Sequence, residues 1–285
     1  MHRHATPVLG PRSVKCDAHL RRVLAIFMIK SAEADINWDE HWGEYDAAAQ
    51  KNPAQQMRHE FIVNLLNKRC LNSTSMHLLD IGSGQGDMLA KIRKKFPDAK
   101  LAGFELSMSG VEISKKKVPS AALVVADLFH PNPDMEPFHS WATHATCCEV
   151  LEHLDDPIGF LKASARYLSK GAEMVITVPS GPMSLFDKHI GHRQHFTKDS
   201  LSQVIKSSGF EVSRVYRVGF PFFNLYRLTV IARGANLIED VRTGSNGSPG
   251  KFALSVMAAY RLLFRFNLKD SPWGWQLAVL ARKIQ

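Results

Sequence analysis

A short stretch of the chain combines three glycines with a carboxylate. Asp80 is followed at alternate positions by Gly82, Gly84 and Gly86, after an apolar run and before a helical pattern. Glycines allow the backbone to approach a ligand closely, where a Cβ would clash. The G-x-G-x-G spacing differs from the G-x-G-x-x-G of dinucleotide enzymes, and no Gly-Lys-Ser/Thr follows, which excludes a P-loop. The stretch therefore predicts a nucleotide-binding turn of another kind.

Two more carboxylates stand at the ends of apolar runs. Glu105 ends the run 100–105, and Asp127 follows the run 122–126. At the carboxyl end of a strand, a carboxylate can accept two hydrogen bonds from a ribose diol. We expect both carboxylates at the same edge of a sheet as the glycines.

A third group follows the apolar run 142–148. Glu149, Glu152 and His153 are spaced i, i+3 and i+4, so on a helix they would share one face. Three ligands of mixed oxygen and nitrogen type are compatible with a divalent cation but do not require one. We predict no metal site.

Histidines recur at every third position between residues 186 and 197: His189, His192 and His195. They follow a fifth apolar run, at the edge where open α/β sheets bind substrates. A histidine there could take a proton from an acceptor hydroxyl. His195 directly precedes a helix start at Thr197, so a structural role is its alternative.

Apolar runs alternate with helical patterns along the chain. We predict strands at residues 76–81, 100–105, 122–126, 142–148, 173–178, 209–216 and 275–282. This alternation predicts an α/β fold with a mostly parallel sheet.

Five of these stretches resemble class I S-adenosylmethionine-dependent methyltransferases. The matching stretches are LLDIGSGQGDM, GFEL, ADL, CEVLEHLDDP and YLSKGAEMVITVPSGP, and the resemblance covers about residues 45–232 and the last strand. It implies a Rossmann-like seven-stranded methyltransferase sheet in the order 3-2-1-4-5-7-6, with an antiparallel last strand. It also implies S-adenosylmethionine as the cofactor.

The resemblance also assigns cofactor contacts. In the family, the glycine loop holds the methionine part, the second-strand acid the ribose, and the ADL aspartate the adenine. An N-terminal segment often folds over the cofactor, so Trp38, Trp42 and Tyr45 are candidate lid residues, with plain packing as the alternative. The predicted cofactor-binding residues are Asp80, Gly82, Ser83, Gly84, Gly86, Glu105, Leu106, Asp127, Leu128, Cys148 and Tyr45.

For the acceptor side, the resemblance points to oxygen chemistry. Some quinone-pathway O-methyltransferases show a similar E-x-x-E-H run associated with a divalent cation, while other relatives carry LEH without one. The histidine loop is similar to loops of methyltransferases associated with polysaccharide and lipid-glycan enzymes. The predicted catalytic residues are His189, His192, Glu149 and His153. We predict O-methylation of a small molecule or of a glycan- or lipid-linked acceptor.

Charge is distributed unevenly. The net charge is +9, yet residues 31–210 hold nineteen basic and twenty-two acidic residues, so the surplus lies in the flanks. Basic flanks suit an anionic partner such as a membrane surface. Nucleic acid is disfavoured, because the fourth strand ends in Cys148-Glu149 instead of the Asn/Asp-Pro-Pro-aromatic of base methylators. A nucleic-acid methyltransferase and a non-catalytic S-adenosylmethionine-binding module remain the alternative functions.

Domain organisation follows from the same patterns. We predict an N-terminal extension, residues 1–35, and one methyltransferase domain, residues 36–285, with a helical insertion at about 221–270. The insertion holds helical patterns at 222–232 and 252–268, and Val256 and Phe266 fall on the apolar side of the second. Four cysteines without C-x-x-C spacing and no long apolar run predict a cytoplasmic protein, with peripheral contact at the inner membrane face as a further expectation.

Overall fold

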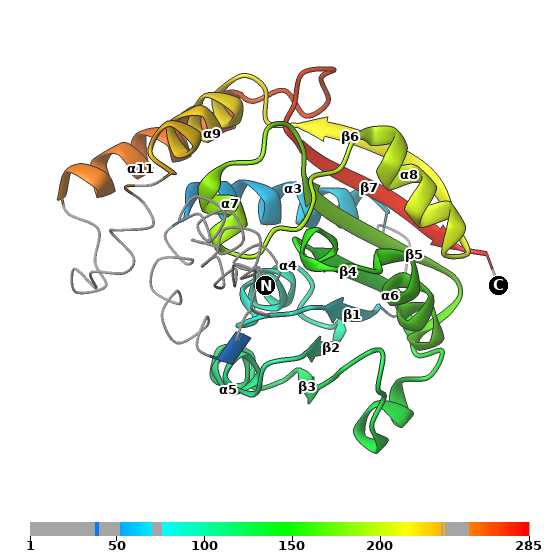
Figure 1. Ribbon diagram of the computed structural model, residues 1–285. Coiled ribbons are helices and arrows are strands. Elements are labelled where there is room, and N and C mark those ends of the chain that lie inside the picture. Colours follow the sequence, from blue (N-terminus) through cyan, green and yellow to red (C-terminus); the bar gives the residue numbers. More distant parts are fainter. Residues whose placement is uncertain (1–37, 40–51, 70–75, 235, 237–250, 285) are drawn as a thin grey trace, which may run out of the picture. The chain divides into compact units, whose positions relative to one another are not determined.

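A seven-stranded sheet forms the centre of the computed structural model (Figure 1). The strands are β1 (His77–Ile81), β2 (Lys100–Glu105), β3 (Ala122–Val125), β4 (Ala142–Cys148), β5 (Leu168–Pro179), β6 (Phe210–Val218) and β7 (Gln276–Lys283). Their order is β3-β2-β1-β4-β5-β7-β6, and β7 is antiparallel to both β5 and β6. This confirms the predicted sheet order.

The structure describes residues 38–39, 52–69, 76–234, 236 and 251–284. All of them belong to one unit, Ile36–Gln285. The predicted extension, residues 1–35, lies outside the described residues, as do the lid candidates Trp42 and Tyr45.

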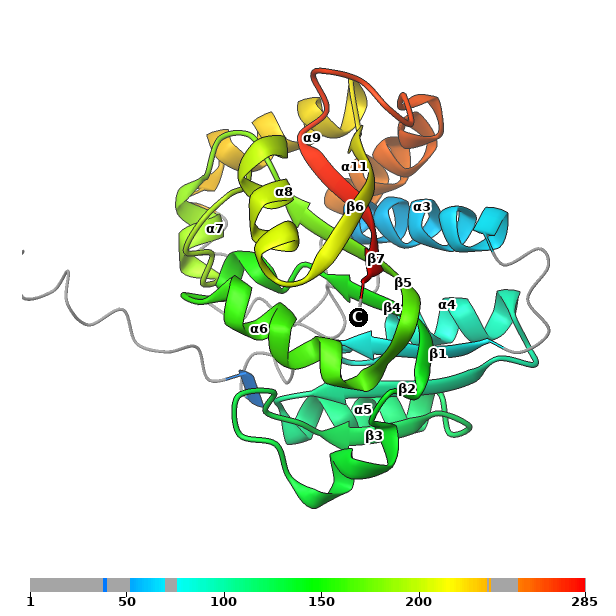
Figure 2. The same cartoon turned by 90° about the vertical axis from the view of Figure 1, so that its right-hand side faces the viewer.

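Helices cover both faces of the sheet (Figure 2). They are α3 (Pro53–Arg69), α4 (Asp87–Lys95), α5 (Met108–Lys117), α6 (Pro157–Ser164), α7 (Leu185–His189), α8 (Lys198–Ser207), α9 (Phe222–Ala232) and α11 (Lys251–Leu263), with short 3-10 turns η1 (Pro133–Phe138), η2 (Leu151–His153), η3 (Ala165–Tyr167) and η4 (Phe264–Phe266). Neighbouring residues of β1 enter opposite layers: Leu78 packs with α3 and α4, and Leu79 with α6 and α8. Because helices cover both faces of the sheet, the strands are continuous apolar runs. Such runs are recognisable in the sequence, and the strands could therefore be predicted from it.

One strand departs from its predicted start. β5 begins at Leu168 instead of Glu173, because β4 pairs through an irregularity: Ala142 lies opposite Leu168 and His144 opposite Glu173. Gly171 lies between these pairs at φ 76°, a conformation that favours glycine. Residues 168–172 therefore extend β5 at its amino-terminal end, before the apolar run that predicted the strand.

The helices α9 and α11 lie side by side in both views (Figures 1 and 2), and the rings of Tyr226 and Tyr260 meet edge to face at 5.3 Å.

The second helix of the predicted insertion ends earlier than expected: α11 stops at Leu263, whereas the helical pattern continued to residue 268. Asn267 Oδ1 accepts hydrogen bonds from the amides of Phe222 (2.8 Å) and Phe223 (3.3 Å), and so caps the start of α9. No helix in the described part of the chain is long and apolar enough to span a membrane.

The buried side of α11 also differs from the prediction. Val256 and Phe266, which fall on the apolar side in the predicted helix, are exposed, and Phe264 is buried instead with Tyr260 beside it. The switch to a 3-10 turn at Phe264 changes the angle between successive side chains, so a helical wheel misplaces the last residues.

Candidate active site

A cavity of about 420 Å³ lies at the carboxyl ends of β1, β2, β4 and β5. Helices α3, α7 and α9 contribute its other walls. The predicted cofactor residues that line it are Asp80, Gly82, Ser83, Gly84, Glu105, Leu106, Leu128 and Cys148. The structure thus brings together most of the predicted cofactor residues, which come from four separate motifs.

The glycine turn is tied to the second strand. The amides of Gly82 and Ser83 both donate to the carbonyl oxygen of Phe104, at 2.8 and 3.0 Å. Gly82 has φ 71°, and a Cβ built there would lie 2.5 Å from a methyl group of Val150. Gly86 (φ 79°) does not line the cavity but begins α4. Gly82 is therefore required both by its positive φ and by the contact with Val150, which leaves no room for a Cβ.

Glu105, the last residue of β2, ties the glycine turn to the end of that strand. Its carboxylate is buried and accepts from the amides of Gly84 (2.8 Å) and Ser107 (3.0 Å). A carboxylate has about four acceptor positions, so it can also accept from a diol.

Two polar atoms in the glycine turn suggest that a ligand completes it. Ser83 Oγ and Gln85 Nε2 are buried without a hydrogen-bond partner among the described residues. Buried polar atoms are normally paired, so such atoms beside a cavity need an explanation. A polar ligand such as S-adenosylmethionine would supply partners, and the residues fit it.

Asp80 is a buried acid at the end of β1. Thr146 Oγ1 donates to its carboxylate at 2.6 Å. Burial raises the pKa of Asp80 to about 7, so the carboxyl group is only partly ionised at neutral pH. A cationic ligand nearby would favour the ionised form. Asp127, in contrast, does not line the cavity; its carboxylate accepts from the amide of Phe129 and contacts His130 Nδ1.

The expected face of Glu149, Glu152 and His153 does not form. Glu149 has φ 57°, and only Leu151–His153 make a turn of 3-10 helix, so the three side chains do not share a helical face. The prediction of a common face is wrong because the chain leaves β4 through a left-handed residue. Such backbone strain often occurs at functional sites.

Glu149 lies in the cavity wall and is held from three sides. Its Oε1 accepts from Thr177 Oγ1 (3.0 Å) and Gln276 Nε2 (2.8 Å). Its Oε2 lies 3.5 Å from Nε of Arg58, which reaches across from α3. This carboxylate is therefore fixed in place.

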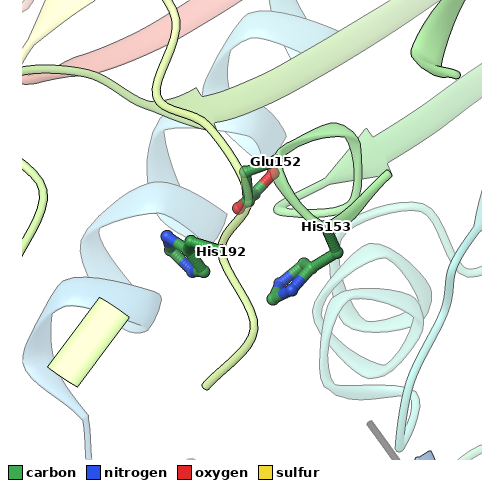
Figure 3. A group of neighbouring side chains, drawn as sticks. All are labelled: Glu152, His153 and His192. Carbon is green, nitrogen blue, oxygen red and sulfur yellow. The ribbon is translucent and has the colours of Figure 1, made fainter. Parts of the chain in front are cut away.

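His153 and His192 also line the cavity, with their rings edge to face at 4.8 Å (Figure 3). Nδ1 of His153 lies 3.1 Å from the Gly191 carbonyl oxygen, and Nδ1 of His195 lies 3.1 Å from that of Gly181. A carbonyl oxygen only accepts, so both Nδ1 atoms carry protons. In a neutral ring, each Nε2 then carries a lone pair.

The same logic fixes the tautomer of His192. Its Nδ1 lies 3.1 Å from Nε2 of His195, which accepts in the neutral ring, so His192 Nδ1 donates and its Nε2 holds the lone pair. Burial, followed by the nearby His153, lowers the pKa of His192 to about 3. The ring is therefore neutral at neutral pH and a weak base.

The remaining predicted catalytic residue lies elsewhere. His189 is exposed at the end of α7 and does not line the cavity. Among the lid candidates, Trp38 does line it, with its ring 5.0 Å from that of His153.

Sequence reasoning missed a buried ion pair in the wall. Arg227 on α9 holds both oxygens of Asp187 on α7, at 3.0 and 2.6 Å. Burial opposes ionisation, but the guanidinium prevails and lowers the pKa of Asp187 to about 2. The available signal was a lone arginine within the apolar helix 222–232. Arg58 on α3 gave no comparable signal.

Among the described residues of the cavity wall, carboxylates outnumber arginines and lysines. Its acids are Asp80, Asp87, Glu105, Glu149 and Asp187, and its arginines are Arg58 and Arg227. An acidic wall suits a cationic ligand such as a sulfonium.

Comparison with known proteins identifies the fold and the domain. Residues 53–215, more than half of the chain, match the family model described as a methyltransferase domain. Malonyl-[acyl-carrier protein] O-methyltransferase of Priestia megaterium is 32% identical over 105 residues, covering 35% of this chain and 36% of that protein. Trans-aconitate 2-methyltransferase of Methylobacterium radiotolerans is 28% identical over 101 residues, covering 35% and 37%.

The match spans little more than a third of either curated relative's length. Among solved structures, geranyl diphosphate C-methyltransferase of Streptomyces coelicolor, in a complex that includes S-adenosyl-L-homocysteine, is similar with a TM-score of 0.50. The identity is 14%, over 80% of this chain and 76% of that one, so the likeness concerns the fold alone.

Proposed function

The chain belongs to the family of methyltransferase domains, whose cofactor is S-adenosylmethionine, and on that premise we propose that it methylates an oxygen atom of a small-molecule acceptor. In this proposal the glycine turn and Glu105 hold the cofactor. The acidic wall around Asp80 favours its positive charge. The reacting methyl group would then point toward α7, α9 and the histidine loop.

The observation that carries the choice of oxygen is the pair of imidazole lone pairs. Nε2 of His153 and Nε2 of His192 belong to side chains of the cavity wall, and each opposite Nδ1 is engaged in a hydrogen bond. Such lone pairs can accept an acceptor's O–H and orient its oxygen toward the sulfonium methyl. Orientation of this kind contributes on the order of 7–11 kcal/mol to a bimolecular step.

The transfer itself balances simply. The sulfur–methyl bond breaks, its electron pair stays on sulfur, and an oxygen–methyl bond forms, which leaves S-adenosylhomocysteine. A hydroxyl acceptor also releases a proton to water, whereas a carboxylate acceptor releases none.

The weak basicity of His192 favours an acidic oxygen, because such an oxygen needs little help to ionise. The names of both curated relatives contain carboxylic-acid acceptors, malonyl and trans-aconitate, which supports the same class here.

The experiment is a transfer assay with cofactor labelled in its methyl group. The protein is incubated with a cell extract, which is then separated into small-molecule, lipid and nucleic-acid fractions. The proposal expects stoichiometric S-adenosylhomocysteine and label in the small-molecule fraction. Label in nucleic acid would contradict it, and no S-adenosylhomocysteine above background would indicate a non-catalytic binding module.

A lipid-linked acceptor is the second candidate, favoured by the exposed surface of α9, α11 and η4. Apolar side chains there are about half exposed or more: Leu225 (49%), Leu228 (49%), Leu262 (56%) and Phe266 (67%). Arg261 and Arg265 are exposed on the same elements. Apolar groups rimmed by basic ones are the pattern of an interfacial helix.

Flotation with liposomes tests this candidate. We expect wild type to float with anionic liposomes, less so at high salt. Changing Arg261 and Arg265 to Glu should abolish flotation, whereas the same change at Lys115 and Lys116 of α5, also exposed, should not. A wild-type protein that ignores both anionic and neutral liposomes would exclude the membrane-surface version.

A further inference from the structure

Glu152 is buried in a way that needs an explanation. Its side chain is 0% exposed, and neither carboxylate oxygen has a hydrogen-bond partner among the described residues. Burying a carboxylate without a partner is costly, and such groups are usually paired or coordinate a metal. Glu149, three residues earlier, contacts Thr177, Gln276 and Arg58. These contacts do not involve Glu152, so they do not account for its burial.

The neighbours of Glu152 are two metal-ligand side chains. Figure 3 shows its carboxylate beside the imidazoles of His153 and His192. One donor atom from each of the three residues lies within 4.8 Å of the others. The two segments are held together, because the amide of Arg193 donates to the backbone oxygen of Glu152 at 2.8 Å.

The hydrogen bonds behind the imidazoles orient them for ligation. Nδ1 of His153 faces the Gly191 carbonyl, and Nδ1 of His192 faces His195, so Nε2 is the nitrogen through which each ring would ligate a metal. Metal-ligating histidines almost always donate their other ring nitrogen in this way.

A second arrangement of the same loop does not serve as well. Asp187, His192 and His195 also lie close together. The oxygens of Asp187, however, already accept from Arg227 and Ser184, and Nε2 of His195 accepts from His192. Of these two clusters, it is the Glu152 cluster whose carboxylate has no hydrogen-bond partner among the residues that the structure describes.

We propose that Glu152, His153 and His192 bind a divalent transition-metal cation at the acceptor end of the cavity. Two imidazole nitrogens and one carboxylate suit Mn²⁺, Fe²⁺, Co²⁺ or Zn²⁺ better than Mg²⁺ or Ca²⁺, which prefer oxygen ligands. Three protein ligands leave coordination positions open. The sequence led us to predict no metal site. The group of possible ligands considered there was Glu149, Glu152 and His153, whereas the proposed site has His192 in place of Glu149.

The cation would define the acceptor class more closely, a point that rests on the proposed function. His153 and His192 belong to the cavity wall, so an open coordination position there could take an acceptor oxygen. With the cation bound, the two Nε2 lone pairs would hold the metal in place of the acceptor's O–H, and the metal would orient the acceptor oxygen and lower the pKa of a ligated hydroxyl. The acceptor would then be a hydroxyl or carboxylate compound able to bind a metal.

Calorimetry with chelator-treated full-length protein tests the site, using Mn²⁺, Zn²⁺ and Mg²⁺ separately. We expect one equivalent of Mn²⁺ or Zn²⁺ to bind more tightly than Mg²⁺. Glu152→Gln and His192→Asn should each weaken binding by at least about tenfold. His189→Gln, which changes an exposed histidine of the same loop, should not. Electron paramagnetic resonance of the Mn²⁺ or Co²⁺ form should report nitrogen ligation.

Two outcomes would overturn the proposal. One is wild type that binds S-adenosylmethionine but no transition metal at millimolar concentration, in which case Glu152 is buried as a neutral acid and the proposed function stands. The other is a folded Glu152→Gln protein that binds metal as tightly as wild type. Loss of S-adenosylmethionine binding by the metal-free wild type would instead count against the proposed function, so the two failures are distinguishable.

Discussion

Replacing Glu105 with Gln removes one negative charge from the proposed cofactor site while nearly preserving side-chain volume. The carboxylate accepts from the amides of Gly84 and Ser107 and lies in the cavity wall. An amide side chain retains one acceptor oxygen, so it cannot hold both backbone amides and also accept from a ribose diol.

The size of the effect follows from these contacts. A hydrogen bond to a charged group contributes about 1.5–3 kcal/mol, and at least one such bond to the cofactor would be lost. We therefore expect the Kd for S-adenosylmethionine to rise by about ten- to a hundredfold. The turn itself should also loosen, because a backbone amide loses its charged partner.

Calorimetry with S-adenosylmethionine and S-adenosylhomocysteine measures this directly. Glu112→Gln, at an exposed glutamate of α5, is the matched control and should bind like wild type. Circular dichroism would verify that the Glu105→Gln protein is folded. A folded variant that binds the cofactor within about twofold of wild type would refute the assignment of Glu105.

Three further variants probe other parts of the site. Asp80→Asn should weaken cofactor binding yet stabilise the free protein at neutral pH. The pKa of Asp80 in the folded state, about 7, lies above the ordinary 3.8, so the wild type loses stability as pH rises between these values and the variant does not. Thermal melts of both proteins at pH 5 and pH 8 would show this difference. Gly82→Ala should lower the melting temperature and abolish cofactor binding, since it adds a steric clash to about 1–2 kcal/mol of backbone strain. Gly209→Ala, at φ 88° with no atom within 4 Å of the added Cβ, should lower stability by the backbone strain alone. His192→Gln should reduce turnover by about a hundredfold with cofactor affinity intact, while His189→Gln should leave turnover unchanged; equal effects of both would contradict the placement of the acceptor.

The sheet and the grouping of the glycine turn with Glu105 around one cavity were predictable because local sequence encodes them. A strand buried on both faces must be apolar, and a turn that needs positive φ needs glycine, as at Gly82. Strand ends in a parallel sheet meet at one edge, so Asp80 and Glu105 could be brought together without knowledge of the helices.

The acceptor half was less predictable because it depends on long-range packing. Spacing alone cannot tell that Glu149 would follow β4 in a left-handed conformation, so that it does not share a helical face with Glu152 and His153. Nor can it tell that, among three evenly spaced histidines, His192 enters the cavity and His189 faces solvent. Arg58 of α3 stands more than 90 positions before Glu149, and no local pattern marks a contact between them.

The most direct test of the account is to identify the atom that receives the methyl group. The protein would be supplied with S-adenosylmethionine carrying a ¹³C methyl group and with a small-molecule extract, and the product methyl observed by ¹³C NMR. The account predicts an O-methyl resonance that grows together with S-adenosylhomocysteine for wild type and is strongly reduced for Glu105→Gln at limiting cofactor. A methyl resonance on nitrogen or carbon, or no turnover by a protein that binds the cofactor, would contradict it.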